Sequence, residues 1–295
     1  MMRPADLKTR IFLDGGDPAE TDKIMSLLGF LDGQTTNPTL IAKNPEARRR
    51  LDQGLKFEEQ EVLDFYRGVV RAISDLIPRG SVSVEVYGDA VTSADSMLRQ
   101  GREMFSWIPN AHVKFPTSKE GLAAAQRAVK EGMRVNMTLC FSEEQAAAVY
   151  AATRGAAKGQ VFVSPFVGRL DDRGENGMEV IANIMALYKQ GDGHVEVLTA
   201  SVRSPDHLLY ALMLGSDIIT VPYGVLRAWG EQGMPLPRPD YRYGAGALRP
   251  IPYREISLDR PWQDYDIRHP LTDMGMEKFS ADWKALIGTA ERKTA

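Results

Sequence analysis

The sequence lacks most of the features that would place a chain outside the cytoplasm. It has a single cysteine, Cys140, so no intrachain disulfide can form and a reducing cytoplasm is the expected compartment. No apolar run approaches the roughly 18 residues that span a bilayer. The opening segment MMRPADLKTR is too polar for a signal peptide. We therefore expect a cytoplasmic chain with no membrane partner.

A surplus of charge of one sign is also absent. The 36 Lys+Arg against 39 Asp+Glu leave a formal net charge of −3, which gives no electrostatic footprint for nucleic acid. The four histidines are scattered without a ligand-spaced pair, so we expect no metal site. Neither a GxGxxG segment after the first strand nor a P-loop occurs, which removes both nucleotide-binding signatures.

What the sequence does contain is an alternation of strand-like and helix-like segments almost to residue 228. The strand candidates are 10–14, 31–36, 81–87, 111–115, 133–139, 160–164, 194–200 and 217–221. Helical spacing is found at 56–77, 93–107, 118–131, 142–154 and 178–189, with Ser142 and Ser204 as N-caps. In the longest helix the predicted apolar face consists of Phe57, Phe65, Val69, Ile73 and Leu76. This order favours a (β/α)8 TIM barrel of the α/β class; an open doubly wound sheet is the alternative.

The amino-acid composition changes after the last strand candidate. Residues 232–268 are rich in proline and tyrosine and show no sustained periodicity. We expect one barrel domain over residues 1–295, with 232–268 packed on it as an extension and a final helix at 272–288.

Charged and polar residues stand where buried strands should be apolar. Strand alternation sends Asp14, Glu85, Lys114, Asn136 and Thr138 into the barrel interior, near the carboxyl ends of the strands. In barrel enzymes that end carries the active site. The alternative is a structural ion-pair cluster, although buried ion pairs seldom stabilise a fold more than apolar residues would.

Lys114 is the residue that suggests a reaction. A lysine amine in a water-poor pocket can lose its proton and condense with a ketone or aldehyde to a Schiff base, which then accepts electrons from a breaking C–C bond. Asp14 and Glu85 could move the protons. His112 lies two residues before Lys114 and is interpreted as a satisfied barrel histidine, and Cys140 as a small core residue.

Basic residues follow two later strands. Arg169 comes after the sixth strand, and Ser201 and Arg203 follow the seventh, just before a helix that starts near Ser204. Guanidinium groups and a helix N-terminus at this end of a barrel indicate a phosphate site. The alternative is that both arginines are ordinary surface charges.

Eight segments in order resemble the transaldolase family of class I, Schiff-base-forming aldolases. They are FLDGG, DGQTTNPTLIAK, VSVEV, VKFP, NMTLCFS, VSPFVGRLDDRG, LTASVRSP and HPLTDMGMEKFSADW. The resemblance covers residues 10–228 and resumes at 269. It implies a barrel that acts on sugar phosphates without a cofactor, and it is compatible with a homo-oligomer.

The resemblance also implies a role for each matched residue. Lys114 would form the Schiff base, and Asp14 would be the acid/base at the substrate hydroxyl beside the breaking bond. Glu85 and Thr138 would hold a catalytic water. Dihydroxyacetone would be bound by Asn37, Asn136 and Ser164, and phosphate by Arg169, Ser201 and Arg203.

Two positions distinguish branches of the family. Transaldolases proper resemble this chain in carrying Glu85 in VSVEV and Phe166 in SPFVGR, whereas the fructose-6-phosphate aldolase branch usually has Gln and Tyr there. The resemblance thus implies a transaldolase of the pentose phosphate pathway, which moves dihydroxyacetone from a ketose phosphate to an aldose phosphate. The alternatives are an aldolase, a transaldolase for another sugar, or a silent phosphosugar-binding barrel. The 232–268 extension departs from compact family members and could reshape the acceptor pocket.

Overall fold

Parallel strands paired in chain order form a closed barrel in the computed structural model of the protein, which describes residues 2–288. Strand β8 pairs with β1 and closes the ring, which confirms the (β/α)8 barrel over an open sheet. The strands are β1 (Arg10–Asp14), β2 (Gly33–Thr35), β3 (Ser81–Glu85), β4 (Ala111–Pro116), β5 (Val135–Cys140), β6 (Val161–Pro165), β7 (Val195–Thr199) and β8 (Ile218–Pro222).

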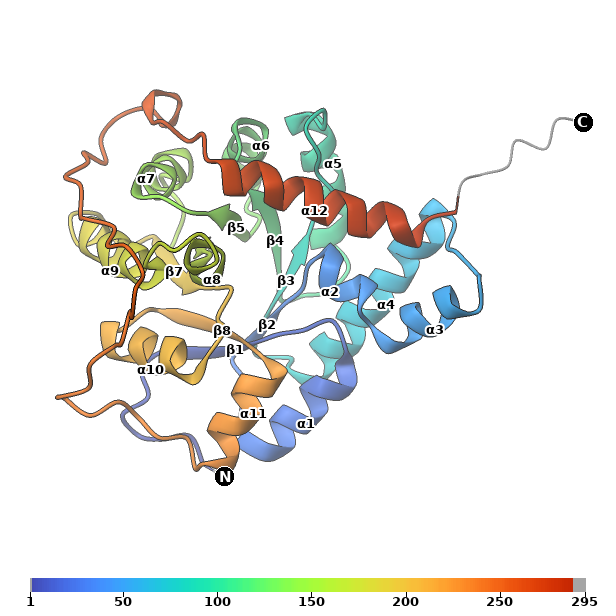
Figure 1. Ribbon diagram of the computed structural model, residues 1–295. Coiled ribbons are helices and arrows are strands. Elements are labelled where there is room, and N and C mark those ends of the chain that lie inside the picture. The colour runs from blue at the N-terminus through green and yellow to red at the C-terminus, as the bar shows by residue number, and fades with distance from the viewer. Residues whose placement is uncertain (1, 289–295) are drawn as a thin grey trace, which may run out of the picture.

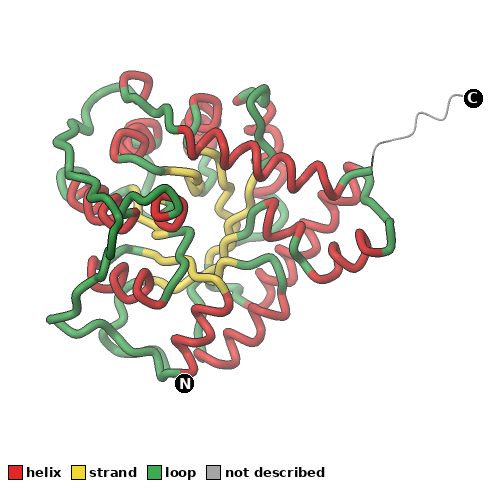
Figure 2. The backbone as a smooth tube through the Cα atoms, in the orientation of Figure 1, coloured by secondary structure: helices red, strands yellow, loops and turns green. Residues whose placement is uncertain are grey.

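Helices surround the strands, as Figures 1 and 2 show. They are α1 (Pro18–Leu28), α2 (Pro38–Ala42), α3 (Pro45–Asp52), α4 (Glu59–Leu76), α5 (Ala94–Phe105), α6 (Lys119–Lys130), α7 (Glu143–Ala152), α8 (Val167–Asp171), α9 (Gly177–Tyr188), α10 (Pro205–Leu214), α11 (Tyr223–Glu231) and α12 (Pro270–Leu286). Among the residues described, none of these helices combines the length and apolar character that a bilayer crossing requires.

Side-chain caps start several helices where the sequence indicates. The hydroxyls of Ser142 and Ser204 each accept a backbone N–H at 3.2 Å, as predicted. Helix α12 runs over Pro270–Leu286 rather than 272–288. It begins earlier because the ring of His269 accepts the Leu271 N–H at 3.2 Å and Pro270 takes the first helical position.

The apolar face predicted for α4 is partly wrong. Val69 and Ile73 are buried, but Phe65 and Leu76 are only half-buried. Phe65 packs its ring against Phe57 at 5.3 Å, in the N-terminal half of the helix. The residue that turns fully inward is Tyr66.

Two segments far along the chain shape the outside and one end of the barrel. Residues 232–268 run past α10, α9 and α7, with one 3-10 turn at Trp262–Asp264 (Figures 1 and 2). The Tyr243 ring stacks on Tyr210 of α10 at 4.8 Å, and Asn183 of α9 donates to the Ile251 carbonyl at 2.9 Å. Helix α12 then crosses one end of the barrel (Figure 1), packing on α2 and β5.

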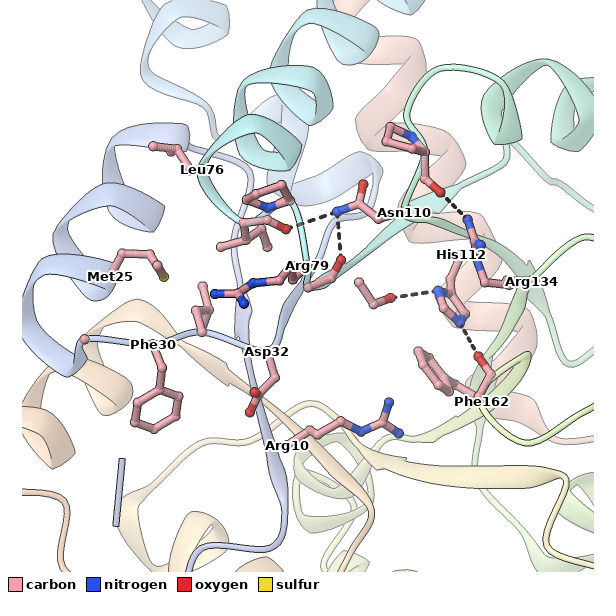
Figure 3. A pocket seen from close by; sticks show the side chains of 18 residues that line it. Arg10, Met25, Phe30, Asp32, Leu76, Arg79, Asn110, His112, Arg134 and Phe162 are labelled. Atoms are coloured by element: carbon pink, nitrogen blue, oxygen red, sulfur yellow. Dashed lines mark hydrogen bonds between the residues drawn. The ribbon is translucent and has the colours of Figure 1, made fainter. Parts of the chain in front are cut away.

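The opposite end, where the strands begin, holds a cavity of about 700 Å³ with Arg10, Arg79 and Arg134 in its lining. The guanidinium groups point in different directions and do not converge (Figure 3). His112 stacks on Phe162 at 4.0 Å and bonds Ser81 Oγ at 2.7 Å and the Gly159 carbonyl at 3.0 Å. Burial lowers the pKa of His112 to about 3. This histidine is a neutral, satisfied structural residue, as expected.

Candidate active site

The carboxyl ends of the strands surround a second cavity of about 420 Å³, here called the C-terminal pocket. The structure brings most of the predicted site residues into its lining: Asp14, Asn37, Lys114, Ser164, Phe166, Arg169, Ser201 and Arg203. The remaining predicted residues, Glu85, Asn136 and Thr138, are buried beside this lining on β3 and β5. Within residues 2–288, no part of the 232–268 extension lines the pocket.

Lys114 lies at the base of the pocket with its amine held from two sides. Register pairs Glu85 of β3 with Lys114 of β4, so the two side chains lie at the same level in the barrel. The Lys114 Nζ is 2.9 Å from a Glu85 carboxylate oxygen and donates to the Thr36 carbonyl at 3.1 Å. Both side chains of the ion pair are only 4% exposed. The structural ion pair considered above is therefore present, in a position that also opens to the pocket.

Burial opposes charge on both carboxyl groups. The Glu85 pKa is raised by desolvation, which exceeds the opposing attraction of Lys114. Asp14 lies at the pocket floor, where desolvation likewise raises its pKa against the attraction of Lys114. Thr35 Oγ1 donates to Asp14 at 2.8 Å, whereas no described residue forms an ion pair with Asp14. Asp14 thus stays outside the Lys114–Glu85 pair.

A line of buried polar side chains supports one wall. Asn136 donates to Ser83 Oγ at 3.0 Å and accepts from Ser164 Oγ at 2.6 Å, so it fixes Ser164 in the lining. Asn37 caps α2 through its Oδ1, which accepts the Leu40 N–H at 2.9 Å. Asn37 itself is part of the pocket lining.

Strand β5 is irregular next to this wall. The β5–β6 register shifts between Met137 and Cys140, and Leu139 has a φ of 58°. A left-handed backbone at a branched residue is strained, and such strain is found most often at functional sites. Thr138, the residue before it, buries its Oγ1 without a hydrogen-bond partner in the described part of the chain. Cys140 is buried with its pKa raised by desolvation to about 12, in keeping with a core thiol.

The other wall carries positive charge. The Arg169 guanidinium on α8 lies 5.2 Å from the ring centroids of both Phe166 and Phe279. Arg203 pairs with Asp172 at 2.9 Å, and both side chains are more than half exposed. Ser201, before Arg203, has a φ of 59°, a second strained residue in the pocket lining.

The sequence analysis missed several residues of the lining, among them Lys43, Lys278 and Phe279. Lys278 and Phe279 belong to α12, which reaches the pocket only because the whole helix crosses the barrel end. Lysines on exposed helices are ordinary, so no local signal marks them. For residues 2–288, no cluster of histidine, cysteine and carboxylate side chains could hold a metal ion.

Comparison with known proteins shows the family of the chain. The family model of transaldolase/fructose-6-phosphate aldolase matches residues 11–290. A probable transaldolase from Dehalococcoides mccartyi is 37% identical over 94% of this chain and 99% of its own. Probable transaldolases from Roseiflexus sp. and Anaeromyxobacter dehalogenans are 37% and 35% identical, over 91% and 96% of this chain and 95% and 100% of theirs. The chain therefore belongs to the transaldolase/fructose-6-phosphate aldolase family.

Proposed function

We propose that the protein is a transaldolase of the pentose phosphate pathway. It would transfer a dihydroxyacetone unit from sedoheptulose 7-phosphate or fructose 6-phosphate to glyceraldehyde 3-phosphate or erythrose 4-phosphate. The observation that carries the proposal is the buried Lys114 amine, which forms an ion pair with Glu85 in a pocket that also holds Asp14 and two arginines. An amine placed this way suits imine formation with a ketose.

The reaction begins when the Lys114 amine adds to the keto carbon of the donor. Loss of the carbonyl oxygen as water then leaves a protonated imine. Glu85 and Thr138 handle this water, and the unpaired Thr138 hydroxyl supports that assignment. Glu85, whose pKa is raised by burial, can carry a proton between the amine and the departing oxygen.

Asp14 acts in the next step. It takes the proton from the donor hydroxyl beside the C–C bond, the bond breaks, and its electron pair moves into the imine to give an enamine on Lys114. The aldose leaves with its new carbonyl. An acceptor aldose enters, the enamine carbon attacks its aldehyde carbon, and Asp14 returns the proton to the new hydroxyl. Hydrolysis of the imine then releases the product ketose and restores the free amine.

The remaining residues bind and orient the substrate. Asn37 and Ser164, with Asn136 holding Ser164, would contact the hydroxyls of the dihydroxyacetone unit. Arg169, Ser201 and Arg203 would bind the phosphate at the far end of the sugar chain. Phe166 favours transfer over release, because its apolar ring keeps water away from the enamine.

A sugar-phosphate panel assayed with and without an aldehyde acceptor tests the proposal. Turnover that requires both a ketose phosphate donor and an aldose phosphate acceptor is expected. Release of free dihydroxyacetone from fructose 6-phosphate without acceptor would indicate an aldolase instead. Tight binding without turnover would contradict catalysis altogether.

A further inference from the structure

Tyr66 of α4 contacts the groups that hold Lys114. It is not part of the pocket lining, and it was not among the predicted site residues. Its side chain is fully buried. The Tyr66 hydroxyl lies 2.6 Å from Thr36 Oγ1 and accepts the backbone N–H of Glu85 at 2.9 Å. Its ring packs against Trp107 at 5.8 Å and Trp283 of α12 at 6.0 Å, which fixes the position of the hydroxyl.

The hydrogen bonds that join Glu85, Tyr66, Thr36 and Ser83 each have a defined donor and acceptor. Thr36 Oγ1 donates its proton to the Ser83 carbonyl at 2.7 Å, so it can only accept from Tyr66. Burial raises the pKa of Tyr66, so its hydroxyl keeps the proton that it donates. The Glu85 amide therefore donates to Tyr66, Tyr66 donates to Thr36, and Thr36 donates to the Ser83 carbonyl.

The β2–β3 ladder shows what this hydroxyl replaces. Ser81 N–H donates to the Asp32 carbonyl at 3.0 Å, and Thr36 N–H donates to the Ser83 carbonyl at 3.1 Å. The next bond in this parallel register would run from the Glu85 N–H to the Thr36 carbonyl. Glu85 donates to Tyr66 instead, and the Thr36 carbonyl accepts the Lys114 amine at 3.1 Å.

We infer that Tyr66 is a positioning residue for Lys114: by taking the Glu85 amide proton it leaves the Thr36 carbonyl free to orient the amine. Without the hydroxyl, the Glu85 N–H is a buried donor, and the acceptor that the parallel register offers it is that carbonyl. The ladder would extend by one bond, and the Lys114 amine would lose one of its two partners. The inference rests on the proposed function, since it assumes that Lys114 is the nucleophile.

Tyr66→Phe tests this with the full-length protein. We expect the rate of imine formation, measured by quenching donor and enzyme with borohydride at short times, to fall about tenfold, since misaligned nucleophiles react slowly. The KM for the donor should change less than twofold, because Tyr66 does not touch the pocket. Tyr188→Phe is the matched control: its buried hydroxyl donates to the Ala146 carbonyl at 2.8 Å, far from Lys114. It should lower the unfolding temperature and leave imine formation unchanged.

A second variant guards against a folding defect. Thr36→Val removes the acceptor of the Tyr66 proton but leaves the Thr36 carbonyl in place, and it should also slow imine formation without a change in donor KM. In the double variant, the loss in the rate of imine formation should be smaller than the two separate losses combined, since both substitutions break the same series of hydrogen bonds. Imine formation within twofold of wild type in folded Tyr66→Phe or Thr36→Val would overturn the inference. Absence of any Lys114 adduct in the wild-type protein would instead overturn the proposed function.

Discussion

At the scale of single residues, burial decides how the groups around Lys114 behave. The Lys114–Glu85 pair is shielded from water, and desolvation raises the pKa of both Glu85 and Asp14. A raised pKa favours the protonated form of each carboxyl group, which suits groups that exchange protons with a substrate. Phe166 is also buried, with its ring 5.8 Å from Phe141 and the Arg169 guanidinium above it.

Phe166→Tyr tests whether this apolar ring protects the enamine. An added hydroxyl can hold an ordered water in the pocket, so we expect more free dihydroxyacetone from fructose 6-phosphate and less acceptor-dependent transfer. Both rates should be measured on one preparation. If Phe166 only fills space, the ratio of release to transfer will not change.

How far sequence could locate these residues depends on their surroundings. Asp14, Glu85 and Lys114 stand out because a charged residue in an apolar strand is costly without a role. Tyr66 does not stand out, because an aromatic residue on an amphipathic helix normally marks packing. The predicted apolar face of α4 was right at Val69 and Ile73 but included Phe65 in place of Tyr66, so the buried hydroxyl was not anticipated.

At the scale of elements, the positively charged wall depends on a close fit between α8 and the loop after β7. Gly168 N–H donates to the Ser201 carbonyl at 3.0 Å. A Cβ on Gly168 would lie 2.4 Å from that carbonyl oxygen and 2.5 Å from the Arg203 side chain. The loop can approach α8 only because this residue has no side chain.

Gly168→Ala should therefore displace Arg203 and weaken phosphate binding. We expect kcat/KM for a phosphorylated donor to fall about tenfold or more, the usual cost of a lost hydrogen bond to a charged group. Unphosphorylated dihydroxyacetone donors should lose much less. Gly68→Ala, on an exposed turn of α4 with open space around it, is the control and should leave both rates unchanged. Equal losses with the two kinds of donor would argue against a phosphate contact.

The elements that follow local rules were predictable, and those set by tertiary contacts were not. The caps Ser142 and Ser204 and the strand order follow from residue type and periodicity. The crossing of α12 over the barrel end depends on contacts with α2 and β5, distant in sequence. Gly275 shows how closely α12 packs on the barrel: a Cβ there would lie 2.5 Å from Arg169 and 2.6 Å from Leu139.

At the scale of the whole molecule, the closed barrel buries ionisable groups, such as Asp14, that reduce its stability. Because burial raises the pKa of Asp14, the folded chain binds this proton more tightly than the unfolded chain does. The Asp14 carboxyl therefore lowers the free energy of unfolding of the wild-type protein as the pH rises above 3.8, its ordinary pKa. The loss is complete above the raised pKa of the folded state. Such a cost is typical of residues retained for function.

Asp14→Asn removes this titration while keeping an oxygen that can accept from Thr35. The variant should unfold at a higher temperature than wild type at neutral pH, and the difference should shrink toward about pH 4. Its kcat should fall about 10²–10⁴-fold, while the donor imine still forms. Thermal unfolding across the pH range and steady-state assays measure both. A variant that is less stable by the same amount at every pH would contradict the charge argument.

Identification of the lysine that becomes covalently bound tests the account most directly. Wild-type protein is incubated with fructose 6-phosphate, reduced with borohydride and digested, and the modified peptide is identified by mass. The account predicts one reduced adduct, on Lys114, that disappears in Lys114→Arg. An adduct on Lys43 or Lys278, which also line the C-terminal pocket, or one that persists in Lys114→Arg, would contradict it.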